Sequence, residues 1–234
     1  MPDIIRFYSE GAKELIAADC IIFGFDEDEL KLLVIKRLFE PSMGEWSLIG
    51  SFIKKDENLS DAPKRILYEL TGLTDVYMSQ LYAHGDVNRD PGARVITVSY
   101  YALINIQNHD SKLVKEYGAR WVSIGKLPKL VFDHNEMVEM ALNRLRKEAK
   151  YKPIGFELLP QKFTLPKLQS LYEAIYQKKI DKRNFRKSIL KTEVLDKLDE
   201  KEKESSKKGA FYYSFNEENY KKLTEKGFYF NVTV

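Results

Sequence analysis

The sequence predicts a two-domain protein of the α/β (α+β) class, with an α/β/α sandwich around a mixed sheet in residues 1–150 and a winged helix in residues 151–234. In the first part, strand-like runs alternate with two helical segments; the second part has the order helix, short break, basic helix, hairpin. Charge divides at the same place: residues 1–150 contain 20 Lys+Arg against 23 Asp+Glu, and residues 151–234 contain 18 against 12. A basic second domain suggests an anionic partner, nucleic acid ahead of a membrane surface; charge alone does not separate this from an ordinary lysine-rich solvated surface, and the order of the elements favours the nucleic acid.

The first domain begins with a predicted β-hairpin. IAADCIIFGF (16–25) and LKLLVIKR (30–37) are β-rich and flank an acidic turn at residues 26–29. Three more strands are predicted, at VYMSQLYAHGDVN (76–88), ARVITVSYYALI (93–104) and ARWVSIGKLP (119–128). Residues 132–150 predict a helix, because apolar side chains recur at i, i+3, i+4 and i+7, namely Val138, Ala141, Leu142 and Leu145.

The stretch GSFIKKDENLSDAPKRILYELTGL, from Gly50 to Leu73, resembles a Nudix box. The general pattern is G-x5-E-x7-R-E-U-x-E-E-x-G-U, with U an aliphatic residue. Glu57, Arg65 and Glu69 fall in register on three of its charged positions. Ser51 stands where the pattern has a glycine, and Ile66 and Leu70 stand where it has glutamates.

The two lost glutamates change the chemistry that this helix can perform. Positions 66, 69 and 70 are predicted to share one helix face, which in a Nudix enzyme presents carboxylates to divalent cations. Glu69 alone does not supply the dense oxygen ligation that Mg²⁺ requires. We therefore predict no catalytic residue, no metal site and no cofactor, with Glu57, Arg65 and Glu69 as vestiges of the box.

A plain amphipathic helix is the alternative interpretation of this segment, with an accidental match to the box. Its core side would then be Ile66, Leu67 and Leu70. In either case Ser60 is the expected N-cap, and Pro63 lies in the first turn, where its missing N–H costs nothing.

The second domain follows a predicted linker at residues 151–162. Thr164 and Asp181 are the expected caps of two successive helices. The first helix is expected to bury Leu168, Leu171, Tyr172 and Ile175; the second is expected to bury Phe185, Ile189 and Leu190 and to expose its basic side chains. Residues 194–215 predict a hairpin wing with a lysine-rich tip at Lys207-Lys208-Gly209.

Together these features resemble the Nudix-related transcriptional regulators, a bacterial family of NrtR type. The matching phrases are KRLFEPSMGEWSLIGSF, VNRDPGARVITVSYYALI, LVFDHNEMVEMALNRLR and TLPKLQSLYEAIYQKKIDKRNFRKSIL. The resemblance implies a DNA-binding regulator whose Nudix domain senses an effector and which controls NAD metabolism or the use of sugars, including pentoses such as arabinose. Its effectors are ADP-ribose-like nucleotides, sugars or sugar phosphates. Because Ile66 and Leu70 replace metal ligands, we expect a sugar or sugar phosphate.

Seven residues are candidates for the effector pocket: Arg37, Trp46, Glu57, Arg65, Glu69, Arg94 and His134. Each has a structural alternative, such as an i, i+4 pair between Arg65 and Glu69, a core role for Trp46, or helix capping by His134. In the second domain Lys182, Arg183 and Asn184 are expected at DNA base edges. The residues expected at DNA phosphates are Arg186, Lys187, Lys191, Lys207 and Lys208.

The predicted partners are a double-stranded DNA operator, a small-molecule effector and a second copy of the chain, because winged helices commonly read paired half-sites. No membrane association is expected, and the protein is expected in the cytoplasm. The single cysteine, Cys20, lies in an apolar strand and is expected to be buried and unreactive. The alternative function is a Nudix hydrolase of nucleoside diphosphate compounds such as ADP-ribose, with an accessory C-terminal domain.

Overall fold

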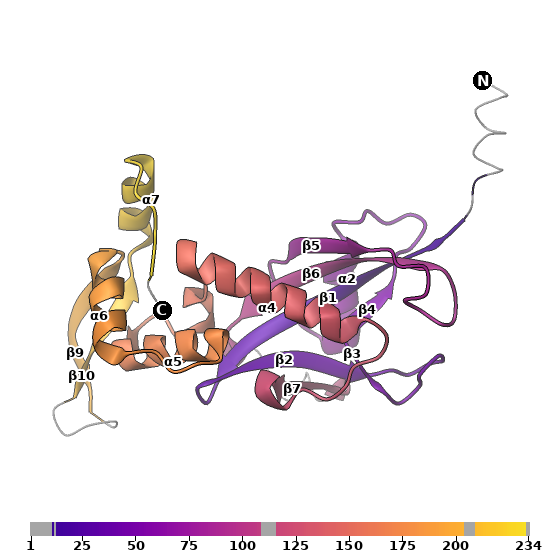
Figure 1. Ribbon diagram of the computed structural model, residues 1–234, viewed down its shortest axis with the longest axis horizontal. Helices are drawn as coiled ribbons and strands as arrows, with labels where there is room; N and C mark the ends of the chain where they lie inside the picture. Colours follow the sequence, from indigo (N-terminus) through magenta and orange to yellow (C-terminus); the bar gives the residue numbers. More distant parts are fainter. Residues whose placement is uncertain (1–10, 12, 109–115, 204–208, 233–234) are drawn as a thin grey trace.

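The computed structural model describes residues 11, 13–108, 116–203 and 209–232. The first part is a seven-stranded sheet with helices on both faces (Figure 1). Its strands are β1 (Leu15–Asp26), β2 (Glu29–Lys36), β3 (Trp46–Ser47), β4 (Ile49–Phe52), β5 (Ser79–His84), β6 (Val95–Ile104) and β7 (Ala119–Ser123). The order is β3-β2-β1-β6-β5, with β4 also on β1 and β7 also on β2. The β1–β6 pair is parallel and the other pairs are antiparallel, so the predicted mixed sheet is confirmed.

The predicted hairpin is formed by β1 and β2. Asp26 pairs with Glu29, and the two residues between them, Glu27 and Asp28, have φ of 50° and 61°. Two left-handed residues make the turn whose twist matches that of paired strands, and Asp, found here at position 28, tolerates this conformation better than most residues.

Among the residues that the structure describes, one helix covers each face of the sheet, which confirms the α/β/α sandwich. Helix α2 (Ala62–Thr71) packs on a core that includes Cys20 and Ile49, and α4 (His134–Tyr151) packs on the opposite core. Helix α2 begins after Asp61 with no side-chain cap, so the prediction of Ser60 as N-cap was wrong. Pro63 does lie in the first turn. Cys20 is fully buried, and burial raises the pKa of its thiol.

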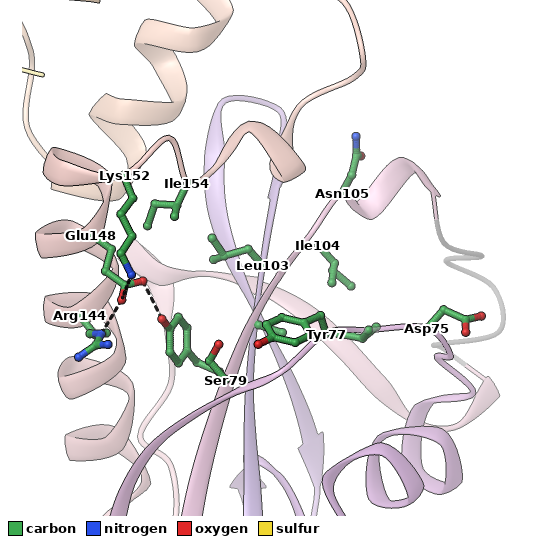
Figure 2. A pocket seen from close by; sticks show the side chains of 13 residues that line it. Asp75, Tyr77, Ser79, Leu103, Ile104, Asn105, Arg144, Glu148, Lys152 and Ile154 are labelled. Atoms are coloured by element: carbon green, nitrogen blue, oxygen red, sulfur yellow. Dashed lines mark hydrogen bonds and ion pairs between the residues drawn. The ribbon is translucent and has the colours of Figure 1, made fainter. Parts of the chain in front are cut away.

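Strand β6 extends further than its edge neighbour β5. Pairing between them starts at Ser79, opposite Tyr101, so residues 102–104 of β6 have no β5 residue beside them. The second half of α4 lies alongside this end of β6 (Figure 2). The short 3-10 turns of the first part are η1 (Ile106–Asn108) and η2 (Ile124–Lys126).

The second part is a winged helix, as predicted. It contains η3 (Phe156–Leu158), β8 (Phe163–Thr164), α5 (Leu165–Tyr176), α6 (Lys182–Lys191), β9 (Leu195–Glu202), β10 (Ala210–Phe215) and α7 (Glu217–Glu225). Both predicted caps are present: Thr164 accepts from the amide of Lys167 and Asp181 accepts from the amide of Asn184. The wing is a three-stranded sheet in the order β8-β10-β9. Leu190 was expected inside but is 37% exposed, because Phe185 and Ile189 already fill the side of α6 that faces α5.

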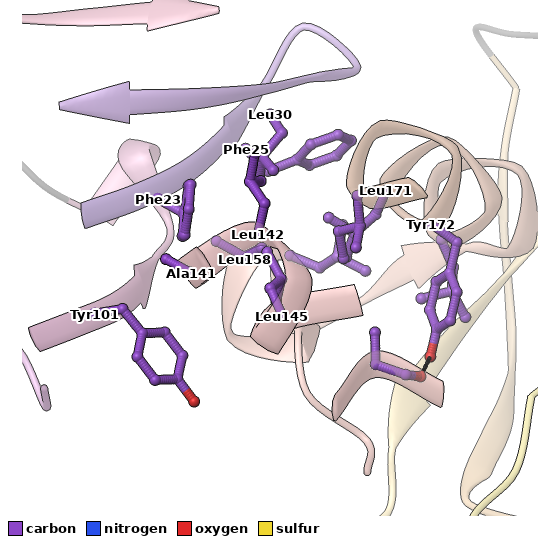
Figure 3. Close-up of a cluster of buried hydrophobic side chains, with 14 of the residues drawn as sticks. Phe23, Phe25, Leu30, Tyr101, Ala141, Leu142, Leu145, Leu158, Leu171 and Tyr172 are labelled. Atoms are coloured by element: carbon purple, nitrogen blue, oxygen red, sulfur yellow. Dashed lines mark hydrogen bonds between the residues drawn. The ribbon is translucent and has the colours of Figure 1, made fainter. Parts of the chain in front are cut away.

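The two parts share one hydrophobic core across the linker. Phe25 and Leu30 of the hairpin, Leu142 and Leu145 of α4, and Leu171 and Tyr172 of α5 belong to the same buried cluster (Figure 3). The Tyr172 hydroxyl donates to the carbonyl of Ala149 at 3.2 Å. The hairpin turn also reaches α5, since Lys167 Nζ lies 2.9 Å from Asp28 Oδ1. Among the described residues, no helix is both long enough and apolar enough to cross a membrane.

Candidate functional site

The three charged residues of the Nudix box, Glu57, Arg65 and Glu69, form one network of ion pairs together with Lys54. Arg65 on α2 donates from Nε to Glu57 Oε1 at 2.5 Å and from NH2 to Glu57 Oε2 at 2.7 Å. Its NH1 donates to Glu69 Oε2 at 2.8 Å, and Lys54 Nζ contacts the other oxygen of Glu69 at 3.3 Å. The hydrogen bonds from Arg65 lower the pKa of Glu57 to about 2 and also lower the pKa of Glu69. Both carboxylates are therefore ionised and already neutralised by cations.

The predicted shared face of residues 66, 69 and 70 divides into two environments. Ile66 is fully buried in the core beneath α2, and Leu70 packs against the same core. The Glu69 carboxylate instead binds Arg65 and Lys54 at the surface. In the described part of the chain, no group of three or more His, Cys, Asp or Glu side chains has metal-binding geometry.

Beside this network lies a small cavity of about 40 Å³ over β1 and β4. Arg37, at the end of β2, places its guanidinium carbon 4.4 Å from the Phe39 ring centre and 5.0 Å from that of Phe132. Its Nε donates to the carbonyl of Pro41 at 2.9 Å. Cations stack favourably on aromatic faces, so the two rings hold the guanidinium at the mouth of the cavity.

The cavity floor is made of buried polar groups on β1, β3 and α4. The amide of Leu48 donates to His134 Nδ1 at 3.2 Å, so the proton of neutral His134 is on Nε2, which lies 3.8 Å from Asp19 Oδ1. Burial lowers the pKa of His134 and favours this neutral form. Thr97 donates to the other Asp19 oxygen at 2.7 Å. The floor therefore presents a carboxylate and an imidazole in fixed orientations.

A second cationic group, Arg89, borders the same cavity. Arg89 Nε and NH2 donate to the two carboxylate oxygens of Asp133 at 2.9 and 2.8 Å. Arg89 also borders an open groove of about 930 Å³ between β5 and α4, which is lined by polar residues such as His84, Asn88 and Glu136. We call the small cavity and this groove together the effector cleft.

The structure places the predicted pocket residues unequally. Arg37 and His134 line the effector cleft. The box residues lie at its edge, because Arg65 NH2 donates to the carbonyl of Phe52, which also lines the cavity. Trp46 does not line the effector cleft; its ring lies 5.1 Å from Lys36 Nζ and 5.9 Å from the Arg120 guanidinium carbon.

Arg94 also lies outside the cleft lining. Its NH1 donates to the carbonyls of Gly85 and Asp86, both at 2.8 Å, and so ties down the loop between β5 and β6. His134 is the first residue of α4, and the position before it is held by Asp133, which makes no side-chain cap. Arg89, Asp133 and Phe39 also border the effector cleft but were not predicted from the sequence. Arg89 lies within VNRDPGAR and Asp133 directly precedes His134, so both stand in phrases that already carried the family resemblance.

The candidate DNA-reading surface is α6 with the wing. All six predicted residues of α6 are exposed, namely Lys182, Arg183, Asn184, Arg186, Lys187 and Lys191. The predicted wing residues Lys207 and Lys208 lie outside the described residues. Two lysines of β9 were missed: Lys197 and Lys201 place Nζ 3.7 and 4.4 Å from the Phe211 ring centre. A groove of about 440 Å³ is lined by Phe211 together with Lys182 and Arg186 of α6.

Two family models match the chain, and they divide it as the fold does. The model of the NUDIX domain matches residues 13–141, and the model of the NrtR DNA-binding winged helix domain matches residues 155–215. The ADPR responsive transcriptional repressor NtrR of Acinetobacter baylyi is 32% identical over 216 residues, which covers 91% of this chain and 86% of that relative. ADP-ribose pyrophosphatase of Methanocaldococcus jannaschii is 32% identical over 127 residues, which covers 53% of this chain and 70% of that enzyme.

Solved structures of Shewanella oneidensis NrtR are similar over both parts. Its complex with a 27mer DNA has a TM-score of 0.77 at 28% identity and covers 94% of this chain and 99% of that one. Its NUDIX domain in complex with ADP ribose has a TM-score of 0.51 at 29% identity and covers 60% of this chain and 97% of that one. The winged helix exposes its basic helix α6, and in the Nudix domain Arg65 pairs with both remaining carboxylates of the box. This chain belongs to the NrtR-type family of Nudix-related transcriptional regulators.

Proposed function

We propose that the protein is a transcriptional repressor that binds a double-stranded DNA operator through α6 and the wing, and whose operator affinity changes when ADP-ribose occupies the effector cleft. The observation that carries this proposal is α6 itself. Asp181 caps it, Phe185 and Ile189 anchor it, and its other side chains, Leu190 apart, are polar or basic. A rigid basic helix of this kind, followed by a hairpin, has the geometry with which winged helices enter a major groove.

ADP-ribose is favoured over the sugar that the sequence suggested, because one relative is an ADPR responsive repressor, another is an ADP-ribose pyrophosphatase, and the NUDIX domain of Shewanella oneidensis NrtR was solved with ADP ribose. The reason for expecting a sugar was the loss of metal ligands at Ile66 and Leu70. Arg37 weakens that reason, because a guanidinium group can bind a diphosphate directly through charge-assisted hydrogen bonds, whereas Arg89 already donates from Nε and NH2 to Asp133. The rings of Phe39 and Phe132 add flat surfaces suited to a base.

A compact sugar is a second candidate effector, and the cavity floor is the observation that favours it. The cavity itself is only about 40 Å³ and is bordered by Asp19, Ser47 and His134, all buried. Polar groups fixed in a small space recognise hydroxyls by paired hydrogen bonds and reject molecules that leave them unpaired. A pentose would occupy this floor without needing either arginine.

We further propose that the Nudix-like domain is catalytically inactive and that the regulator acts as a homodimer. Ile66 and Leu70 lie against the core where glutamates would be required, and Arg65 engages both remaining carboxylates of the box. Two copies of α6 related by two-fold symmetry would read the two halves of one operator.

The test is a reciprocal binding measurement. An operator is first selected from a random duplex library, and its affinity is then measured by fluorescence anisotropy with and without ADP-ribose or arabinose. The true effector must change operator affinity, and the operator must change effector affinity by the same factor. If selection enriches no sequence, α6 is not a DNA reader. If ADP-ribose leaves operator affinity unchanged while arabinose shifts it, the second candidate replaces the first.

A further inference from the structure

A second cavity lies at the other end of α4 from the effector cleft. It has a volume of about 620 Å³ and lies between the second half of α4 and the end of β6 (Figure 2). None of its lining residues borders the effector cleft. It lies beyond Ser79, the point where β5 stops pairing with β6, so the missing strand leaves the space open.

One wall of this cavity is a row of charges on a single face of α4. Arg144 Nε donates to Glu148 Oε1 at 2.7 Å, Lys152 Nζ lies 3.4 Å from the same oxygen, and the Tyr101 hydroxyl donates to Glu148 Oε2 at 2.8 Å. Burial and its contact with Glu148 raise the pKa of Tyr101 to about 12, so this hydroxyl keeps its proton. Both oxygens of Glu148 therefore already have donors.

Exposure separates the carboxylate of this row from its cations. The side chain of Glu148 is 12% exposed, whereas those of Arg144 and Lys152 are 54% and 58% exposed. The Glu148 carboxylate is thus shielded from solvent and paired with donors. The groups with which this wall can bind a ligand in the cavity are the Arg144 guanidinium and the Lys152 ammonium. These groups donate only, so the wall is complementary to an acceptor-rich anion such as a phosphate.

The rest of the lining combines polar Asp75, Ser79 and Asn105 with apolar and aromatic surface on which a ring could lie. Tyr77 is 86% exposed, lies next to the cavity and is held on a segment whose neighbour, Val76, is buried. Leu103 adds apolar surface away from the charged wall, and Ile154 adds apolar surface beside Lys152 (Figure 2). Small-molecule sites typically measure roughly 300 to 1,000 Å³ and combine apolar walls with a few polar groups. The volume and composition here fall within that description.

We propose that this cavity is a second ligand site, which binds a small phosphorylated metabolite with its phosphate on Arg144 and Lys152 and its sugar or base over Tyr77. The site adjoins the joint between the two domains. On the same turns of α4, Arg146 Nε donates to the carbonyl of Ile175 at 3.1 Å, and the Tyr176 hydroxyl donates to the carbonyl of Arg146 at 2.7 Å. A ligand here would rest on the helical turns that carry α5 of the winged helix.

The experiment titrates the full chain by calorimetry with two probes, inorganic phosphate and ribose 5-phosphate. Wild-type protein should bind one equivalent of each. Lys152→Gln and Arg144→Gln should each weaken both probes about tenfold, the loss of one charge-assisted hydrogen bond. Tyr77→Ala should weaken ribose 5-phosphate and leave inorganic phosphate unchanged. Lys150→Gln is the matched control, because it removes a cation from the same end of α4 whose Nζ lies over Tyr151 and which does not line the cavity.

Arg37→Gln, in the effector cleft, separates the two sites, since it should leave both titrations unchanged. Circular dichroism of each variant checks the fold, and Lys152→Gln keeps the test decisive if Arg144→Gln is destabilised. The proposal is overturned if neither probe binds saturably to wild-type protein. It is equally overturned if Lys152→Gln and Tyr77→Ala bind like wild type, or if Arg37→Gln abolishes the binding. These outcomes do not depend on whether ADP-ribose regulates operator binding.

Discussion

Gly50 lies directly opposite Asp19 in the sheet, and the Asp19 carboxylate occupies the space that any side chain at position 50 would need. A Cβ at residue 50 would lie 2.0 Å from Asp19 Oδ1 and 3.2 Å from the carbonyl of Ala18. Ser51 stands at the glycine position of the box, and Gly50 directly precedes it. Because residue 50 has no side chain, the buried Asp19 carboxylate on the neighbouring strand β1 has room.

Gly50→Ala should consequently destabilise the protein. The Asp19 carboxylate would have to move away from Thr97 and His134, and overpacking of this kind costs roughly 1 to 3 kcal/mol. Denaturant unfolding measures the change. Gly85→Ala is the control, because no atom lies within 4 Å of the added Cβ, and its stability should stay close to wild type. Equal stability of the two variants would show that Asp19 does not hold the position described.

Because the carboxylates of the Nudix box are already paired with cations, we expect no metal-dependent hydrolysis of ADP-ribose. Purified protein with ADP-ribose and Mg²⁺ or Mn²⁺ should release phosphate-containing product no faster than a Glu69→Ala variant, because Arg65 and Lys54 already engage Glu69. The opposite result, turnover that Glu69→Ala abolishes, would assign the chain to the hydrolases. Restoring the lost glutamates is not a simple reverse test of activity. Ile66→Glu would place a carboxylate at a fully buried position and should disrupt the packing of α2 on its core.

Glu57 should contribute to acid stability in a defined pH range. Arg65 lowers the pKa of Glu57 from 4.5 to about 2 in the folded protein. A lowered folded-state pKa means that the stabilisation is fully present above pH 4.5 and is lost as the pH falls towards 2. Glu57→Gln should therefore be less stable than wild type at neutral pH, and the difference should shrink in acid. Glu218→Gln, on an exposed i, i+4 pair with Lys222, should show a much smaller difference because solvent screens that pair.

The recognition helix predicts two distinguishable kinds of DNA defect. Arg183→Ala or Asn184→Ala should cost roughly 1 to 3 kcal/mol on the selected operator and relax preference at one position of each half-site. Lys197→Ala should weaken specific and scrambled duplexes alike and reduce the dependence of affinity on salt, because fewer counterions are released. Lys147→Ala, an exposed charge on α4, controls for net charge. An Arg183→Ala, Arg186→Ala, Lys187→Ala triple variant that binds like wild type would rule out α6 as the reading element.

Local sequence rules accounted for most of the fold. Thr164 and Asp181 cap helices where their side chains predict it, and the buried faces of α4 and α5 follow their apolar periodicity. Two local rules failed, at the Ser60 cap and at Leu190, and the failures at the candidate site are contacts between residues far apart in the chain. Arg89 with Asp133, and Arg37 with Phe132, join different loops, and no local spacing indicates either pair. Trp46 and Arg94 were predicted for the pocket but lie outside its lining, because pairing across the sheet and closure of the loop between β5 and β6 decide where they lie.

Helix α4 begins at the effector cleft, ends beneath α5 and contributes to the core of both halves. A cut between residues 150 and 151 would leave Leu171 and Tyr172 without the helix that covers them. The winged helix therefore does not have a complete core of its own without α4. A recombination event that attached it to another sensor would have to bring α4 along, so sensor and reader are constrained to be inherited and to diverge together.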